Sequence, residues 1–153
     1  MPISSEELSN RHEGLVELLA ADGELDANEL DLTVSPAALD FRIKAPGGQA
    51  GHLASFRYFE KYEWQNDVWS LAEYVYLISW QNGLGQYEYH WHPFQWSDGE
   101  SVLHIHCTPP RGTRSHSRGH FILLEEARSD LMIRYASEHP VDCAGLYPLG
   151  QAS

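Results

Sequence analysis

Histidine is the residue of this chain whose number and spacing could do chemistry. The sequence contains nine histidines in 153 residues, and six of them fall between residues 90 and 120. Four of these form two His-x-His pairs, namely His90 with His92 and His104 with His106. Successive side chains of a strand point to opposite faces, so the two members of each pair share a side if these segments are strands. Imidazoles about 5 Å apart across neighbouring strands could bind zinc or a similar divalent metal.

The surroundings of the pairs leave two interpretations of these histidines open. Glu88 or Glu100 could add an oxygen ligand to a metal bound by the imidazoles. Histidine is also common as a half-buried strand residue beside aromatic side chains, where it satisfies a neighbouring carbonyl and needs no cofactor. The sequence thus allows either a metal-dependent enzyme with a histidine cluster or a protein without a cofactor.

Whether the two pairs meet depends on the turn that joins their strands. A three-residue loop at Ser97–Gly99 would place His92 opposite His104 and bring both pairs to one face. A two-residue turn at Asp98–Gly99 would shift the pairing by one and send the second pair to the face of the aromatic residues. Pro93 could add a bulge, so both registers stay open.

The same region also allows chemistry without a metal. Cleavage of an RNA phosphodiester needs a base for the 2′-hydroxyl, an acid for the leaving oxygen and cations for the charge that develops on phosphorus. The candidate catalytic residues are His104, His106, His116 and His120. The candidate substrate-binding residues are Arg111, Arg114 and Arg118 for phosphate, with Tyr89 and Trp91 for base stacking. We expect the segment from Arg111 to His120 to be a loop, because glycine and serine separate its arginines and histidines.

A resemblance to a known family supports the RNA interpretation. The run Tyr87-Glu-Tyr-His-Trp91, followed by Asp98-Gly99, a loop rich in histidine and arginine and a closing helix, resembles the small TumE-type toxins of prokaryotic toxin–antitoxin pairs over about residues 55–138. The matching positions are Tyr89, His90 and Trp91, with His116 and His120 by approximate place. The resemblance implies a β-meander with a helix, a toxin-like role against a nucleic-acid process, and a protein antitoxin as partner. It implies no particular reaction.

The distribution of charge suggests a further class of function. The net charge is −12, and residues 1–40 contain ten acids and one base, Arg11, for a net of −9. Such an acidic protein opposes nonspecific binding to nucleic acid. An acidic N-terminal arm near the Arg111–His120 segment could gate a phosphate site. Alternatively, the protein is a noncatalytic interaction protein that mimics nucleic acid or binds a basic partner.

Hydrophobic periodicity predicts an α+β fold, in which an antiparallel β-meander sheet is packed by an N-terminal and a C-terminal helix. A capping box at Ser4–Glu7 starts a helix over residues 5–21, and period-two alternation from residue 55 onward predicts strands. Apolar residues at helical spacing predict a long helix between Gly119 and Pro140. We expect a single domain over residues 1–153, with an acidic helix-plus-strands arm at 1–50 and a meander and helix rich in aromatic residues and histidine at 51–140. The arm would form either an edge of the same sheet or a separate flap.

The remaining expectations concern the compartment. No run approaches the ~18 apolar residues of a membrane helix, and the first twenty residues carry glutamates where a signal peptide would carry cations. We therefore expect a cytoplasmic protein without a membrane partner. In that compartment Cys107 and Cys143 should be free thiols.

Overall fold

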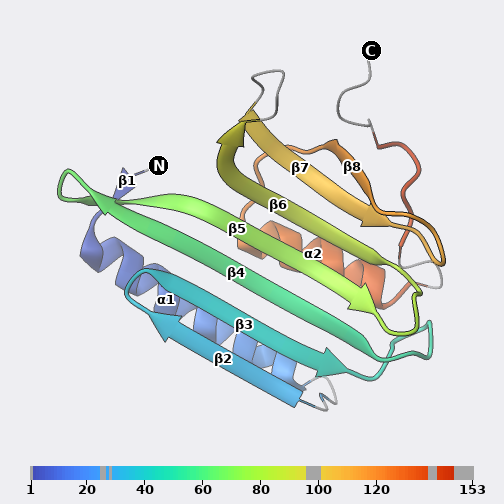
Figure 1. The fold of residues 1–153 in the computed structure, drawn as a ribbon. Helices are drawn as coiled ribbons and strands as arrows, with labels where there is room; N and C mark the ends of the chain where they lie inside the picture. The colour runs from blue at the N-terminus through green and yellow to red at the C-terminus, as the bar shows by residue number, and fades with distance from the viewer. Residues whose placement is uncertain (1, 25–26, 28, 96–100, 138–140, 147–153) are drawn as a thin grey trace.

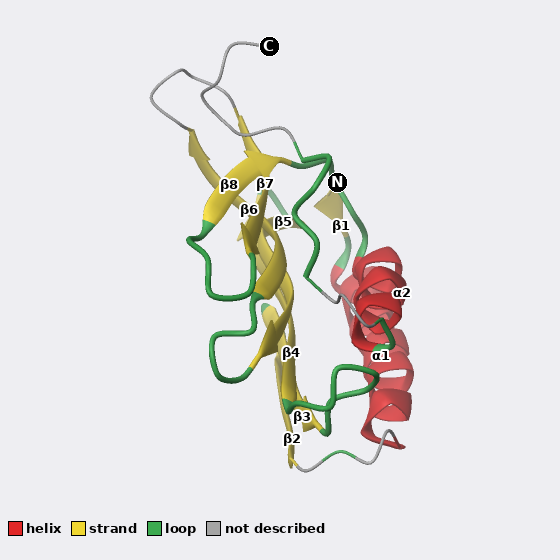
Figure 2. Ribbon diagram, turned by 90° about the vertical axis from the view of Figure 1, so that its right-hand side faces the viewer, coloured by secondary structure: helices red, strands yellow, loops and turns green. Residues whose placement is uncertain are grey.

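The computed structural model describes the chain except for residues 1, 25–26, 28, 96–100, 138–140 and 147–153. The described strands form an antiparallel sheet in the order β2-β3-β4-β5-β6-β7-β8, with β1 paired to β5 (Figure 1). In chain order the elements are β1 (Pro2–Ile3), α1 (Ser5–Ala20), η1 (Ala21–Glu24, a 3-10 helix), β2 (Glu29–Ser35), β3 (Ala38–Ala45), β4 (Ala54–Gln65), β5 (Val68–Trp80), β6 (Gln86–Gln95), β7 (Ser101–Thr108), β8 (Ser115–Arg118) and α2 (Leu124–Tyr135). The helices α1 and α2 lie on the same face of the sheet (Figure 2). The predicted α+β meander with an N-terminal and a C-terminal helix is confirmed.

The first helix forms where its capping box predicts. The backbone N–H of Glu7 donates to Ser4 Oγ at 3.1 Å, and the backbone N–H of Ser4 donates to Glu7 Oε2 at 2.7 Å. These two bonds satisfy N–H groups that the first turn of a helix cannot pair internally. Leu8, Leu15 and Leu19 then share the face that is buried against the sheet. The capping residue and the leucine spacing therefore determine both where α1 begins and which side it buries.

The acidic N-terminal segment belongs to the same sheet as the rest of the chain. β2 pairs with β3 and β3 pairs with β4, both antiparallel, so the segment extends one edge and is not a separate flap. Phe41 and Ile43 on β3 join the core that Tyr58, Tyr74 and Tyr76 form on the next two strands. The buried core thus lies between the helices and one face of the sheet, and no helix among the described residues covers the other face (Figure 2).

The C-terminal helix is shorter than the sequence predicts. α2 begins at Leu124, and Phe121, which the apolar spacing places on the helix, lies before it with an exposed side chain. Residue Leu123 at the N-cap makes no side-chain capping bond. Leu124 and Leu131 are buried against the sheet, as the apolar stripe predicts. Packing rather than capping therefore determines the position of α2.

A buried carboxylate links α1 to the sheet. Glu60 on β4 is 0% exposed and accepts hydrogen bonds from the guanidinium of Arg11, at 2.6 and 3.2 Å. The hydroxyls of Tyr62 and Tyr76 donate to the same carboxylate at 2.8 and 2.7 Å. A buried charge is costly unless it is paired and hydrogen-bonded, and Glu60 meets both conditions. The guanidinium of Arg11 is therefore held in an ion pair with a buried carboxylate.

The two cysteines form a disulfide, and the prediction of free thiols is wrong. Cys107 on β7 and Cys143 lie with their Cα atoms 5.9 Å apart and are bonded to each other. They are 36 residues apart in the sequence, so only the fold brings them together. Disulfides are rare in reducing compartments, and the cytoplasmic location stays a prediction. No helix among the described residues has the length and apolarity needed to cross a membrane.

Candidate metal centre

The histidines gather on the face of the sheet opposite α1 and α2. On β6, Tyr87 and Tyr89 point toward α2 and are buried in the core. Because side chains alternate along a strand, Glu88 and His90 point to the opposite face. His92 follows them, since its ring lies 4.9 Å from that of His90 between centroids. The strand therefore separates an aromatic side from a histidine side.

Next to the histidines, the pairing of β6 with β7 differs by two residues from the register that a three-residue loop would give. His90 pairs with His104, where the three-residue loop would have paired His92 with His104. Gln95 pairs with Ser101, as a three-residue loop would have it, and an irregularity between Trp91 and Gln95 produces the difference at the histidines. A shift of two residues preserves the face, because side chains repeat every two positions. Both His-x-His pairs therefore share a side, as the first register predicts. The turn at Ser97–Gly99 and the candidate ligand Glu100 lie outside the described residues.

Imidazole rings from three neighbouring strands contact one another on this face. The closest centroid separations are 4.4 Å for His106 and His116, 4.5 Å for His104 and His106, and 4.7 Å for His90 and His104. His92 lies 5.4 Å from His104 at the side of the group. We call the rings of His90, His92, His104, His106 and His116 the histidine cluster. The cluster exists because alternation in three strands places these positions on one face.

Three members of the cluster are positioned to share a metal ion. Ring nitrogens of His90, His104 and His106 all lie within 4.8 Å of one another, and the side chains of His104 and His106 are buried. Nitrogens that bind zinc lie 2.0–2.1 Å from the ion, so in a tetrahedral site they lie about 3.4 Å apart. The three nitrogens would therefore have to move closer together to bind an ion, and the Arg114 guanidinium, which contacts His106, would have to give way. The predicted metal ligands His90, His104 and His106 are thus brought together, while His92 lies next to them.

Glu88 supplies a carboxylate beside these nitrogens. Its Oε1 atom lies 3.3 Å from Nδ1 of His106 and 3.5 Å from Nδ1 of His90, and Oε2 accepts a hydrogen bond from Gln86 at 2.9 Å. Burial alone would raise the pKa of Glu88, but the hydrogen bond to His106 and the charges of His106, His90 and Arg114 outweigh it and lower the pKa. The carboxylate is therefore ionised at neutral pH. Glu88 is one of the two oxygen ligands that the sequence suggests, the other being Glu100.

The protonation state of His90 also suits a metal ligand. Burial lowers the pKa of His90 to about 4, because the charged form loses its hydration, although the nearby Glu88 opposes this shift. The imidazole is therefore neutral at pH 7, the form that donates a lone pair to a metal. Its Nδ1 atom is buried and has no hydrogen-bond partner among the described residues. A buried polar atom without such a partner is what a missing ligand would leave.

Two arginines lie beside the cluster, Arg118 on the edge strand β8 and Arg114 just before it, in a segment that the sequence had suggested to be a loop. β8 pairs with β7, so that His116 lies opposite His106 and Arg118 lies opposite His104. The guanidinium of Arg114 contacts Nδ1 of His106 and lies 3.1 Å from its Nε2 atom. The sequence of residues 115–118 is polar throughout and lacks the apolar alternation that would have predicted this strand. The structure thus brings Arg114 and Arg118 to the histidines.

Other predicted site residues lie elsewhere. Arg111 is in the turn before β8, and His120 follows that strand, both with exposed side chains. The Tyr89 hydroxyl donates to Asp130 of α2 at 2.7 Å, and Trp91 packs against the buried core. These two aromatic residues occupy the face opposite the histidines, because their positions alternate with His90. The structure does not bring their rings together with the histidine cluster.

The acidic N-terminal segment is also distant from the arginines in the sheet. β2 and β8 are at opposite ends of the strand order (Figure 1). The expectation that the acidic arm lies near the Arg111–His120 segment is therefore wrong. The sequence could not show this, because the strand order depends on how many strands separate the two segments.

Comparison with known proteins finds no relative of this chain. The chain matches no family model, no curated protein and no solved structure. The resemblance to TumE-type toxins therefore stays a prediction, and the function must be argued from the histidine cluster itself.

Proposed function

We propose that this protein is a metal-dependent enzyme whose His90, His104 and His106 bind a divalent ion of the zinc type. The observation that carries the proposal is the approach of three ring nitrogens to within 4.8 Å of one another. The pKa of His90, lowered to about 4 by burial, keeps one of these ligands neutral at pH 7. The ionised carboxylate of Glu88 beside two of the rings offers a fourth ligand or a base.

Two arginines, Arg118 on β8 and Arg114 just before it, favour a phosphate-bearing substrate, such as RNA. A zinc-type ion supplies an acidified water and polarises a phosphoryl oxygen. In this proposal Arg114, which contacts His106, and Arg118, which pairs opposite His104, would bind the non-bridging oxygens of a phosphate near the ion. Hydrolysis of a phosphate ester is therefore the reaction that this set of groups fits best. A toxin-like role with a protein antitoxin is the biological setting that the TumE resemblance suggests for it.

A metal-independent ribonuclease is the second candidate. Its support is the contact between His106 and His116, whose ring centroids lie 4.4 Å apart next to Arg114. An acid–base pair works best when its pKa values lie near the working pH. Burial, the charge of His106 and the charge of Arg114 lower the pKa of His116, and that of His90 is lowered to about 4. These shifts favour metal ligation over proton transfer at neutral pH.

Metal analysis of protein purified without a histidine tag tests the proposal. We expect about one zinc-type ion per chain, and we expect His104→Ala to weaken zinc binding at least about 100-fold, since it removes a ligand rather than a supporting residue. His52→Ala is the matched control, because His52 is exposed and lies outside the cluster. Equal zinc affinity in His104→Ala and the wild type would rule out the site.

Activity then separates the two candidates. RNA cleavage that is abolished by a chelator and restored by zinc supports the metal-dependent enzyme. Cleavage that persists in the chelator and is lost in His116→Ala supports the metal-independent one. Zinc binding without cleavage of RNA or of a small phosphodiester would contradict the phosphate hydrolase and leave only the metal site.

A further inference from the structure

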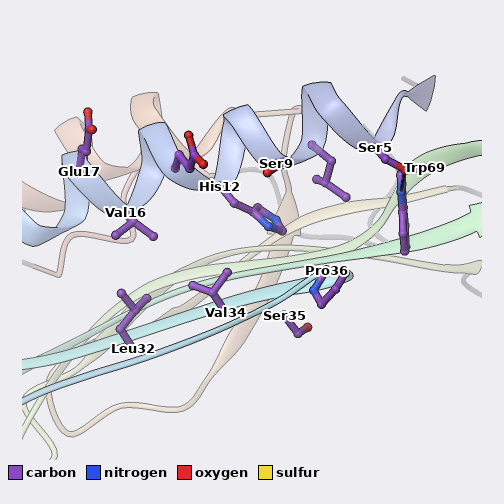
Figure 3. Close-up of a pocket in the computed structure, with 12 residues that line it drawn as sticks. Ser5, Ser9, His12, Val16, Glu17, Leu32, Val34, Ser35, Pro36 and Trp69 are labelled. Carbon is purple, nitrogen blue, oxygen red and sulfur yellow. Dashed lines mark hydrogen bonds between the residues drawn. The ribbon is translucent and has the colours of Figure 1, made fainter.

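A groove separates α1 from the edge strand β2 on the helix side of the sheet. It has a volume of about 710 Å³ and is lined by α1, by β2 with the turn after it, and by Trp69 of β5 (Figure 3). Its apolar lining includes Leu8, Val16, Leu32 and Val34. The groove lies at the opposite edge of the sheet from β8 and is independent of the proposed metal site.

The strand β2 presents apolar side chains beside this groove. Leu30, Leu32 and Val34 are 50%, 37% and 45% exposed, although the pairing with β3 places them on the same face as the buried Phe41. These three side chains continue the apolar face of the sheet past the part that α1 covers. β2 is also the last strand in the described order, so its outer backbone groups have no neighbouring strand among the described residues. An exposed apolar edge strand is a template on which a further strand can pair.

The charge around the groove selects the kind of partner. Glu13 and Glu17 of α1 line it, and Asp31, which alternates with Leu30 and Leu32 and so lies on the other face of β2, pairs opposite Arg42 of β3. Residues 1–40 carry a net charge of −9, and their one base, Arg11, is bonded to Glu60 in the core. A second copy of this chain would bring the same negative charge to the contact and be repelled. A segment with basic residues would be attracted.

A buried imidazole in the groove also requires a partner. His12 is 6% exposed, and its ring points from α1 toward the strands in Figure 3. Its Nε2 atom is buried without a hydrogen-bond partner among the described residues. Burial lowers the pKa of His12, with Glu60 opposing and Arg11 reinforcing the shift, so the ring is neutral at pH 7. An unsatisfied buried polar atom costs free energy that a ligand group in the groove would recover.

We propose that the groove binds an extended segment of a partner protein in which apolar and basic residues alternate. The segment pairs its backbone with the outer edge of β2. Its apolar side chains enter the groove between α1 and β2, where one polar group reaches His12. Its basic side chains lie on the other face, near Asp31. The length of β2, Glu29–Ser35, sets the length of the segment that can pair.

A pair of synthetic peptides tests the proposal. One alternates lysine and valine along roughly the length of β2, and the other has the same composition in two blocks. We expect the alternating peptide to bind at least tenfold tighter by calorimetry, because only it can place all its valines on one side of a strand. Amide chemical shifts should change in α1 and β2, and the Trp69 indole signal should change with them.

Substitutions locate the binding. Leu32→Lys should weaken the alternating peptide at least tenfold, since it places a like charge in the groove. Ile133→Lys, on α2 and 70% exposed, is the matched control and should leave the affinity unchanged. Equal affinity for the two peptides would overturn the proposal, as would binding that Leu32→Lys leaves unchanged. A wild-type dimer that Leu32→Lys converts to a monomer, without peptide binding, would assign the groove to a second copy and overturn it equally.

Discussion

Replacement of His90 by glutamine should make the stability of the metal-free protein less sensitive to acid. Burial lowers the pKa of His90 to about 4, whereas an unfolded chain has the usual value near 6.5. Between these two values the unfolded state binds the proton and the folded state does not, so stability is full above about pH 6.5 and falls as the pH approaches about 4. A difference of one in pKa corresponds to about 1.4 kcal/mol, so the loss amounts to about 3 kcal/mol. The side chain is 17% exposed, so solvent screening leaves most of this effect in place.

Urea unfolding in the presence of a chelator measures this loss directly. The free energy of unfolding of the wild type and of His90→Gln would be determined from about pH 7 to about pH 4.5, where most of the expected change has occurred. Glutamine carries no proton that titrates in this range. The wild type should therefore lose about 2–3 kcal/mol more than the variant over the interval. His52→Gln, in which an exposed histidine is replaced, should follow the wild type.

Parallel pH profiles for the wild type and His90→Gln would refute the reasoning. They would mean that the imidazole of His90 takes up its proton in the folded state as easily as in the unfolded one. The ring would then be hydrated and not held neutral, and it would lose its advantage as a metal ligand at weakly acidic pH.

Three further perturbations have expected outcomes. Arg11→Met should destabilise the protein by about 3–5 kcal/mol in urea unfolding, because it leaves the carboxylate of Glu60 buried without a counter-charge. Addition of Glu60→Gln should recover a large part of that loss, and an additive double variant would contradict the pairing. Zinc at about 100 times its dissociation constant should stabilise the wild type by about 2.7 kcal/mol and should not stabilise His104→Ala to the same degree; an equal rise in melting temperature for both would place the ion elsewhere. Replacement of Cys107 and Cys143 by serine should lower the free energy of unfolding by about 2–4 kcal/mol, since the disulfide closes a loop across a sequence separation of 36 residues. An unchanged free energy of unfolding in oxidising buffer would show that the disulfide does not form.

The sequence predicted the features that depend on periodic spacing of side chains or on local helix capping. Ser4 and Glu7 mark the start of α1 because a capping box is a local interaction. The two His-x-His pairs mark one face of each strand because alternation follows from strand geometry. Whether both pairs face the same side depended on the register, which the sequence left open, and the structure brings His90, His104 and His106 together.

The features that depend on distant parts of the chain could not be predicted. The disulfide joins residues that only the folded sheet brings within reach of each other. β8 is a short strand whose pairing with β7 depends on that neighbour, and its composition alone is typical of a loop. The opposite placement of the acidic segment and Arg114 follows from the number of strands between them, which local patterns do not reveal.

The two-residue irregularity between Trp91 and Gln95 restricts how the connection from β6 to β7 can change in length. Addition or removal of an even number of residues would slide the strands without turning them over. Addition or removal of an odd number of residues would turn the imidazoles of β7 to the face of Tyr87 and Tyr89. It would also bring Ile105 to the opposite face. We therefore expect insertions or deletions of an odd number of residues in this connection to be tolerated less well than substitutions within it.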